Sequence, residues 1–193
     1  MSRSAATLAG EGNCEHAVDP TVAELGGLDA LVNNVATQQL AGDLTGLSTE
    51  RWKRTFKVNV FSYFWTTRAA LKHLPDGGII NTSSINGLRG NKTLIDYAAT
   101  TGAVLALTYS LAQSTAGLRH PGELRGARAG LDATDPVDLR RGPGQLVRQP
   151  GAQGRAAHPD EIVPSYVFFA SGRLSSYDSG EVRAPIGGET LPG

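Results

Sequence analysis

The sequence has little of what metal centres and disulfide-stapled folds require. Its 193 residues include a single cysteine, Cys14, so neither a disulfide framework nor a cysteine metal site is expected. The four histidines are not spaced as metal ligands. No metal site is therefore predicted.

Excess charge and long apolar runs are also missing. The chain has 18 basic and 18 acidic residues, a formal net charge of zero, so nothing in its charge favours nucleic acid or an anionic membrane as a partner. No apolar run reaches the length of a membrane span, and no signal peptide is recognisable. These absences predict a cytoplasmic protein, and the length suits one domain.

Short apolar runs alternate with longer segments of helical periodicity, which is typical of a parallel α/β sheet. Within the first long helix, Ser48 suits an N-cap, and an apolar stripe recurs every four residues from Trp52 to Phe64. The segment from Gly10 to Gly12 is interpreted as a loop. The expected strands are 28–35, 78–83 and 181–187, and the expected helices are 48–74, 96–114 and 159–171.

The stretch 115–153 differs in composition from the rest of the chain. Residues 115–154 contain eight glycines, six arginines and four prolines but no aromatic residue. Such a segment buries little apolar surface and has no clear periodicity, so it is predicted to be irregular. The six arginines also allow an RNA contact, but their spread among glycines favours a solvated loop.

A change of reading frame is a sharper hypothesis for the same stretch. His120–Ala127 can be written in codons whose next frame reads Ile-Arg-Val-Asn-Cys-Val-Ala. Leu131–Leu139 can likewise be written so that the next frame reads Trp-Thr-Arg-Pro-Ile-Pro-Ser-Thr-Phe. The hypothesis is that insertions or deletions in the gene flank this stretch.

Several motifs in order resemble the short-chain dehydrogenase/reductase family. The run 77–84 ends in Ser84, and Tyr97 follows thirteen residues later on a helix, as in the family's serine and Tyr-x-x-x-Lys pair. The segment 28–36 is similar to the family strand that ends in Asn-Asn-Ala-Gly, and 56–60 is similar to its asparagine-bearing helix. The resemblance covers roughly 18–114 and 154–193, and it implies a Rossmann-like parallel sheet with flanking helices.

The resemblance implies catalytic roles for Asn59, Ser84, Tyr97 and Thr101. Tyr97 would exchange a proton with a carbonyl or alcohol oxygen held by Ser84, while NAD or NADP carries the hydride. Thr101 occupies the position of the family lysine, four residues after Tyr97, so the positive charge that favours the tyrosinate is replaced by a hydroxyl. Asn59 would support a water that leads to that lysine.

The cofactor site is the other expected departure from the family. Asn33 and Asn34 are the candidate cofactor-binding residues, but the glycine-rich pyrophosphate motif of the family does not occur before Asn33. The sequence therefore predicts one incomplete domain that lacks the N-terminal strands of the nucleotide-binding half.

Three functional hypotheses remain open from the sequence. The first is an NAD(P)-dependent oxidoreductase homologue for a small carbonyl or alcohol substrate, catalytically impaired. The second is a non-enzymatic protein that associates with an intact relative through the helices carrying Asn59 and Tyr97. The third is a longer, active reductase whose coding sequence has been misread. The same helices also allow a homo-oligomer, although core packing is the safer interpretation of Tyr63, Trp65, Leu105 and Leu111.

Overall fold

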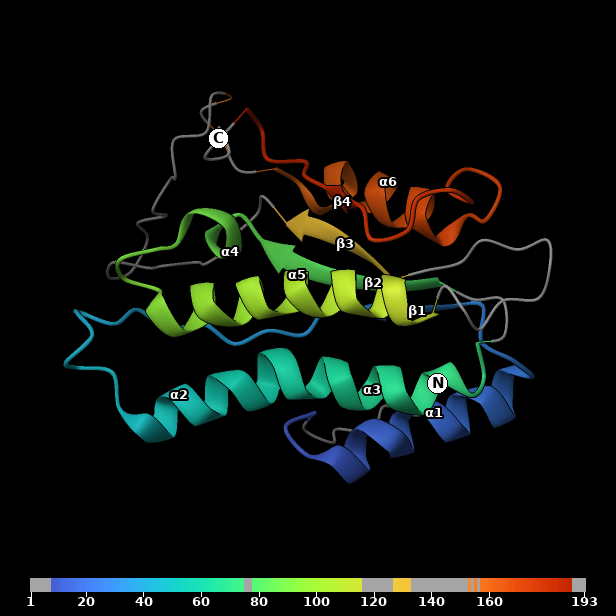
Figure 1. Cartoon of the computed structure of the whole chain (residues 1–193), viewed down its shortest axis with the longest axis horizontal. Helices are drawn as coiled ribbons and strands as arrows, with labels where there is room; N and C mark the ends of the chain where they lie inside the picture. The colour runs from blue at the N-terminus through green and yellow to red at the C-terminus, as the bar shows by residue number, and fades with distance from the viewer. Residues whose placement is uncertain are drawn as a thin grey trace.

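Four parallel strands form the single sheet of the computed structural model (Figure 1), which describes residues 8–74, 78–115, 127–132, 153, 155 and 157–188. The strands lie in chain order across the sheet, and each pairs in parallel with the next. Their bounds are β1 Ala30–Asn33, β2 Gly78–Ser84, β3 Ala127–Asp132 and β4 Val182–Arg183.

Helices cover both faces of this sheet. The long helices α3 and α5 lie on one side with α1 beneath α3, whereas α6 lies on the opposite side (Figure 1). The helices are α1 Glu11–Leu25, α2 Thr49–Phe56, the π-helix η1 Lys57–Phe61, α3 Ser62–Leu71, α4 Asn86–Arg89, α5 Ile95–Thr115 and α6 Pro159–Ala170. The predicted α/β class with a parallel sheet and flanking helices is confirmed.

Most predicted elements lie where the sequence placed them. The strand expected at 78–83 and the helices expected at 96–114 and 159–171 agree with β2, α5 and α6 to within about one residue at each end. The cap at Ser48 is also confirmed, because its hydroxyl accepts a hydrogen bond from the Arg51 N–H at 3.2 Å. The strands expected at 28–35 and 181–187 are shorter, with only 30–33 and 182–183 in the ladder.

Helix α1 was not predicted, and the loop expected at Gly10–Gly12 is wrong from Glu11 onward. The helix contains Pro20 and has few apolar residues, so its sequence carries little helical signal. Packing stabilises it instead. Val18 lies in a core cluster with Ala69, Ala70 and Ile79, which is the tertiary context that periodicity cannot report.

Strand β3 corrects the prediction that 115–153 is irregular throughout. Residues 127–132 pair with β2 along their whole length and with β4 at two positions. The ladder places Ala127 beside Ile79 and Asp132 beside Ser84. Backbone pairing on both sides holds this segment, so the strand needed no apolar alternation to form. The rest of the stretch, apart from residue 115 at the end of α5 and residue 153, lies outside the described residues.

The helix expected at 48–74 is interrupted by one turn of π-helix. The Ser62 N–H bonds to the Lys57 carbonyl, five residues back, in place of the usual four. The buried side of the combined helix is unexpectedly polar, whereas Phe61 and Phe64 are 44% and 47% exposed. Its buried residues are Thr55, Asn59, Ser62, Tyr63, Thr66, Thr67, Ala69 and Ala70.

Within the described ranges, no helix is long and apolar enough to span a membrane, and no group of three or more potential metal-ligating side chains occurs. The residues considered for a dimer interface are mostly internal. Tyr63 and Leu105 are 2% and 4% exposed, and Leu111 packs against the core cluster of α1 and α3.

Candidate active site

Strand β2 directs its side chains alternately to the two helical layers. Asn81 donates to the Thr108 hydroxyl of α5 at 2.9 Å, and the Ser83 hydroxyl donates to the Thr101 carbonyl of α5 at 2.8 Å. Thr82, between them, contacts the Tyr166 hydroxyl of α6 at 2.8 Å. The pleat therefore fixes β2 against both layers and sets the position of the strand end that carries Ser84.

Ser84 ends β2 and is 1% exposed. Its Oγ accepts a hydrogen bond from the Asn86 N–H at 3.2 Å, at the start of the short helix α4. A hydroxyl that accepts one bond keeps its own proton for a second partner. Ser84 is thus held at the carboxyl end of a central strand, where parallel sheets place their ligand sites.

Tyr97 lies in the first turn of α5 and is 7% exposed. Its carbonyl accepts hydrogen bonds from the hydroxyls of Thr100 and Thr101, at 2.7 and 3.2 Å. Helix α5 packs on both β2 and α4, so the tyrosine lies on the element next to the strand that carries Ser84.

Thr101 fits its position as a small, buried residue. It is 5% exposed, and its hydroxyl bonds to the carbonyls of Tyr97 and Ala98. Gly87 of α4 approaches so closely that a Cβ there would lie 2.7 Å from the Gly102 nitrogen and 3.0 Å from the Thr101 hydroxyl. The side chain is therefore satisfied within its own helix and provides no charge.

Asn59 lies in the π-helix and is 3% exposed. Its carbonyl oxygen accepts from the Thr37 N–H at 2.7 Å, and its amide donates to the Thr37 carbonyl at 2.9 Å and to the Thr100 hydroxyl at 3.0 Å. The side chain thereby ties the segment after β1 to α5, one residue before Thr101. Thr37 and Thr100 were not singled out in the sequence, because neither residue type marks such a contact.

Asn33 and Asn34 play different roles despite being neighbours. The Asn33 amide donates to Thr67 at 3.2 Å and to Asn81 at 2.9 Å, and its oxygen accepts from Thr66 at 2.7 Å. This side chain is part of a buried network between β1, β2 and α3. Asn34 is exposed, and its oxygen accepts from the Tyr166 hydroxyl at 3.3 Å.

A buried ion pair beside Tyr97 was missed by sequence reasoning. The carboxylate of Asp96, a residue that is 0% exposed, accepts two hydrogen bonds from the Arg51 guanidinium, at 3.0 and 3.1 Å, and one from Thr55 at 2.7 Å. Burial raises the pKa of Asp96, but the bonds from Arg51 and Thr55 outweigh it and leave the pKa below its ordinary value. The only sequence signal was an aspartate next to the candidate tyrosine.

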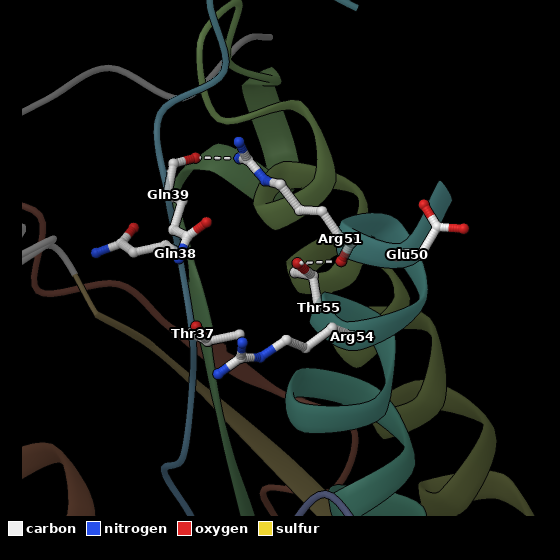
Figure 2. Close-up of a pocket in the computed structure, with 7 residues that line it drawn as sticks. All are labelled: Thr37, Gln38, Gln39, Glu50, Arg51, Arg54 and Thr55. Atoms are coloured by element: carbon white, nitrogen blue, oxygen red, sulfur yellow. Dashed lines mark hydrogen bonds between the residues drawn. The ribbon is translucent and has the colours of Figure 1, made fainter. Parts of the chain in front are cut away.

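Arg51 also fixes the segment that follows β1. Its guanidinium donates to the carbonyls of Gln39 and Leu40, the latter at 3.0 Å. Figure 2 shows this arginine reaching from α2 to the extended segment, with Arg54 one turn further along the helix. A cavity of about 270 Å³ lies between the two elements. Arg51 therefore joins the segment after β1 to Asp96 at the start of α5.

A parallel sheet between two helical layers, with Ser84 at the end of a central strand and Tyr97 on the long helix α5, is a Rossmann-like α/β arrangement. Residues 4–119 match the family model described as short chain dehydrogenase. The chain belongs to the short-chain dehydrogenase/reductase family.

Curated relatives and solved structures agree with this assignment. The chain is 38% identical, over 93% of its length, to NADPH-dependent aldehyde reductase 1, chloroplastic, of Arabidopsis thaliana. It is 40% identical, over 98% of its length, to the glucose and ribitol dehydrogenase of Daucus carota. A short-chain dehydrogenase/reductase mutant of Serratia marcescens superposes with a TM-score of 0.82 at 28% identity over 95% of this chain.

The match covers nearly all of this chain but a smaller part of each relative. The chain spans 62% and 65% of the two curated relatives and 74% of the Serratia structure. The roles of Asn33, Asn34, Asn59, Ser84, Tyr97 and Thr101 stay predictions at this point, because these comparisons name no residue.

Proposed function

We propose that this chain is an NAD(P)-type oxidoreductase homologue whose proton transfer between Tyr97 and a small carbonyl or alcohol substrate is impaired. The observation that carries the proposal is Thr101, which is buried, uncharged and bonded to its own helix. A free tyrosine has a pKa of about 10, so only about one molecule in a thousand is ionised near neutral pH. The uncharged Thr101 side chain supplies no positive charge that would increase that fraction.

In this proposal the remaining residues take the roles that the family resemblance implies. Ser84 would hydrogen-bond the substrate oxygen, and Tyr97 would donate its proton to that oxygen or take one from it. Asn59 would act as a positioning residue, because its three hydrogen bonds join the segment after β1 to α5.

The residues present fit only part of a nicotinamide dinucleotide. Asn34 is exposed beside the carboxyl end of β1 and suits a polar contact to such a cofactor, whereas the Asn33 amide is already engaged in the core. No glycine-rich turn for the pyrophosphate occurs before β1 in the sequence. We therefore propose that this chain binds the nucleotide weakly. A cytoplasmic location belongs to the same proposal and rests on the sequence alone.

The test is to exchange Thr101 for lysine and for methionine. Thr101→Lys restores the cation, and Thr101→Met adds a chain of similar length without charge. Aldehyde reduction is followed by loss of NADPH absorbance, and nucleotide binding is measured separately by fluorescence. We expect no measurable turnover for the wild type. If Thr101→Lys binds NADPH, its turnover should exceed that of Thr101→Met by at least about tenfold.

Two results distinguish the causes of impairment. If Thr101→Lys binds NADPH and stays inactive, the missing cation is not what limits the reaction. If the wild type already turns over at an ordinary enzymatic rate, of the order of 10 s⁻¹, the proposal of impairment is wrong.

Association with an intact relative is the second candidate, and exposed apolar residues on α3 and α5 favour it. Phe64 and Tyr109 are 47% and 42% exposed. Co-purification with a tagged relative tests it, with Phe64→Lys expected to abolish the complex. Val167→Lys, on the exposed side of α6, is the matched control and should leave it intact.

A further inference from the structure

The cavity between α2 and the segment after β1 is lined by two arginines whose partners differ. Its volume is about 270 Å³. All three nitrogens of the Arg51 guanidinium are engaged, with both carboxylate oxygens of Asp96 and with the carbonyls of Gln39 and Leu40. Arg54 also lines this cavity, yet it forms no ion pair with a carboxylate anywhere in the described part of the chain.

Arg54 has a carboxylate within reach on its own helix and does not pair with it. Glu50 lies four residues earlier, the spacing and the order that favour an ion pair on a helix surface. Figure 2 shows the Glu50 carboxylate pointing away from the cavity, whereas the Arg54 side chain extends toward the segment that carries Thr37. The Arg54 cation therefore faces the cavity and not its own helix.

The helix dipole does not explain a cation at this position. Basic side chains are favourable near the end of a helix, where the last carbonyls carry partial negative charge. No helix ends beside Arg54, because Lys57 keeps helical dihedral angles and the chain continues through η1 and α3 to Leu71. Arg54 thus lies within a continuous helical segment, far from its carboxyl end.

Arg54 supplies the charge that is directed into the cavity. It is exposed, whereas the charge of Arg51 is balanced by Asp96 at 3.0 Å. Apart from the two arginines and Glu50, the lining residues carry no charge; they are Thr37, Gln38, Gln39 and Thr55. A guanidinium presents its N–H donors in a planar fork that matches two oxygens of a carboxylate or a phosphate group.

The wall opposite Arg54 is already held in place. The Asn59 side chain bonds to both the N–H and the carbonyl of Thr37, at 2.7 and 2.9 Å, and Arg51 holds the next part of the segment through Leu40 at 3.0 Å. A ligand that binds between α2 and this segment would therefore have little backbone to order, and ordering is one of the main costs of binding.

We propose that this cavity binds a small molecule that carries a carboxylate or phosphate group, with the Arg54 guanidinium holding that group. Ligand pockets typically span about 300 to 1,000 Å³, so a cavity of about 270 Å³ suits a small anion and excludes one of cofactor size. The site does not depend on the proposed reductase chemistry, and it differs from the exposed apolar faces of α3 and α5.

The experiment is NMR of the ¹⁵N-labelled protein, in which inorganic phosphate or acetate replaces chloride at constant ionic strength and neutral pH. Constant ionic strength keeps the screening of all surface charges equal. The Nε–Hε signal of Arg54 should shift and saturate with at least one of the two anions, with a dissociation constant of about 1 mM, at the weak end of specific binding. The backbone N–H signal of Thr37 should follow the same curve.

Two variants compare this site with the general charge of α2. Arg54→Gln removes the fork and its charge-assisted bonds, so the dissociation constant read from Thr37 should rise at least about tenfold. Lys53→Gln removes the same charge one residue earlier, from a side chain that does not line the cavity, so the constant should change by less than about twofold. Both side chains are exposed, and circular dichroism checks that both variants are folded.

The two anions distinguish the ligand groups. Saturation by phosphate alone assigns a phosphate group, and saturation by acetate alone assigns a carboxylate. Three outcomes would overturn the proposal. The first is a shift that rises linearly with both anions. The second is saturation by chloride with the same constant, which would indicate an adventitious ion only. The third is an equal loss of affinity in Arg54→Gln and Lys53→Gln.

Discussion

Asp96 places a carboxylate inside the protein directly beside Tyr97. Arg51, 20% exposed at its side chain, neutralises it and holds the segment after β1 at the same time. One arginine therefore connects α2, the segment after β1 and the start of α5.

Asp96→Asn should lower the free energy of unfolding by about 2 kcal/mol at pH 7. The change keeps the shape of the side chain but leaves the Arg51 cation without its counter-charge in a largely buried place. Urea denaturation measures the effect. Asp43→Asn is the control, since Asp43 lies in an exposed loop and bonds only to nearby Thr45 and Gly46; its change should stay within about 0.5 kcal/mol.

The same pair predicts the direction of the pH dependence. The folded pKa of Asp96 lies below the unfolded value, so its contribution is present above the unfolded pKa and is lost as the pH falls through the folded one. The difference between wild type and Asp96→Asn should therefore shrink in acid. An equal difference at pH 7 and at pH 3 would contradict this account.

At the scale of elements, α4 and α5 meet through a glycine. Gly87→Ala would put a methyl group 2.7 Å from two backbone atoms of α5, which cannot move aside as a flexible side chain could. We expect a loss of about 2 to 3 kcal/mol in unfolding free energy, typical of overpacking. Thermal unfolding followed by circular dichroism measures it.

A matched glycine gives the opposite expectation. Gly12 lies in α1 with open space around the position of a Cβ, so Gly12→Ala should stabilise the protein by about 0.5 to 1 kcal/mol through helix propensity. If both substitutions destabilise equally, the close approach of α4 to α5 is not the cause.

The start of α6 gives a second prediction for an element. Glu161 closes a capping box with His158, and it pairs with both terminal nitrogens of Arg155, at 2.7 and 2.6 Å. The bonds from Arg155 and from the His158 N–H lower the pKa of Glu161 to about 2. Its stabilising effect is present above the ordinary glutamate pKa and disappears as the pH falls toward 2.

Glu161→Gln should therefore lower the melting temperature at pH 7 and make little difference near pH 2. Scanning calorimetry across that range measures both values. Asp160→Asn, one residue earlier in the same helix, is the control for a general loss of negative charge in the first turn. A deficit for Glu161→Gln that persists unchanged at pH 2 would rule out the ionised carboxylate as its source.

At the scale of the whole molecule, the stretch 115–153 separates two parts that carry the family's motifs. The frame hypothesis predicts that the coding DNA permits the shifted readings at His120–Ala127 and Leu131–Leu139. Sequencing the gene, with the region upstream, measures this directly. Codons that forbid either reading would refute the hypothesis, and codons that permit both would point to a longer reductase as the ancestral product.

Much of the fold could be predicted because it rests on local patterns. The apolar core of β2, the cap at Ser48 and the long helix around Tyr97 are written in neighbouring residues. Helix α1 and strand β3 could not be predicted, since α1 forms by packing on α3 and β3 by pairing with β2 and β4. Both depend on contacts between residues far apart in the chain.

The candidate site, like the fold, could be predicted only in part. The order and spacing of Asn59, Ser84 and Tyr97 made them the predicted site residues, but did not predict their hydrogen-bond partners. The Asn59 contacts to Thr37 and Thr100 join residues 22 and 41 positions apart, and no motif encodes them. The apolar stripe from Trp52 to Phe64 was a true pattern, yet the structure buries a mostly polar side of that helix instead.

The π-helix η1 changes the angle at which later side chains leave the helix axis, and this helps to explain why the apolar stripe is not the buried side. One extra residue within a turn advances every later side chain by about 100° around the helix axis, since each residue of an α-helix turns through that angle. The residues after η1, such as Phe64, therefore lie at a different angle around the axis from the one that an uninterrupted α-helix would give them. Removing a single residue from Lys57–Phe61 would return the helix to regular winding. The residues around Asn59 would then rotate away from Thr37 and Thr100. The position of the site residues thus depends on a count of residues as much as on their identity.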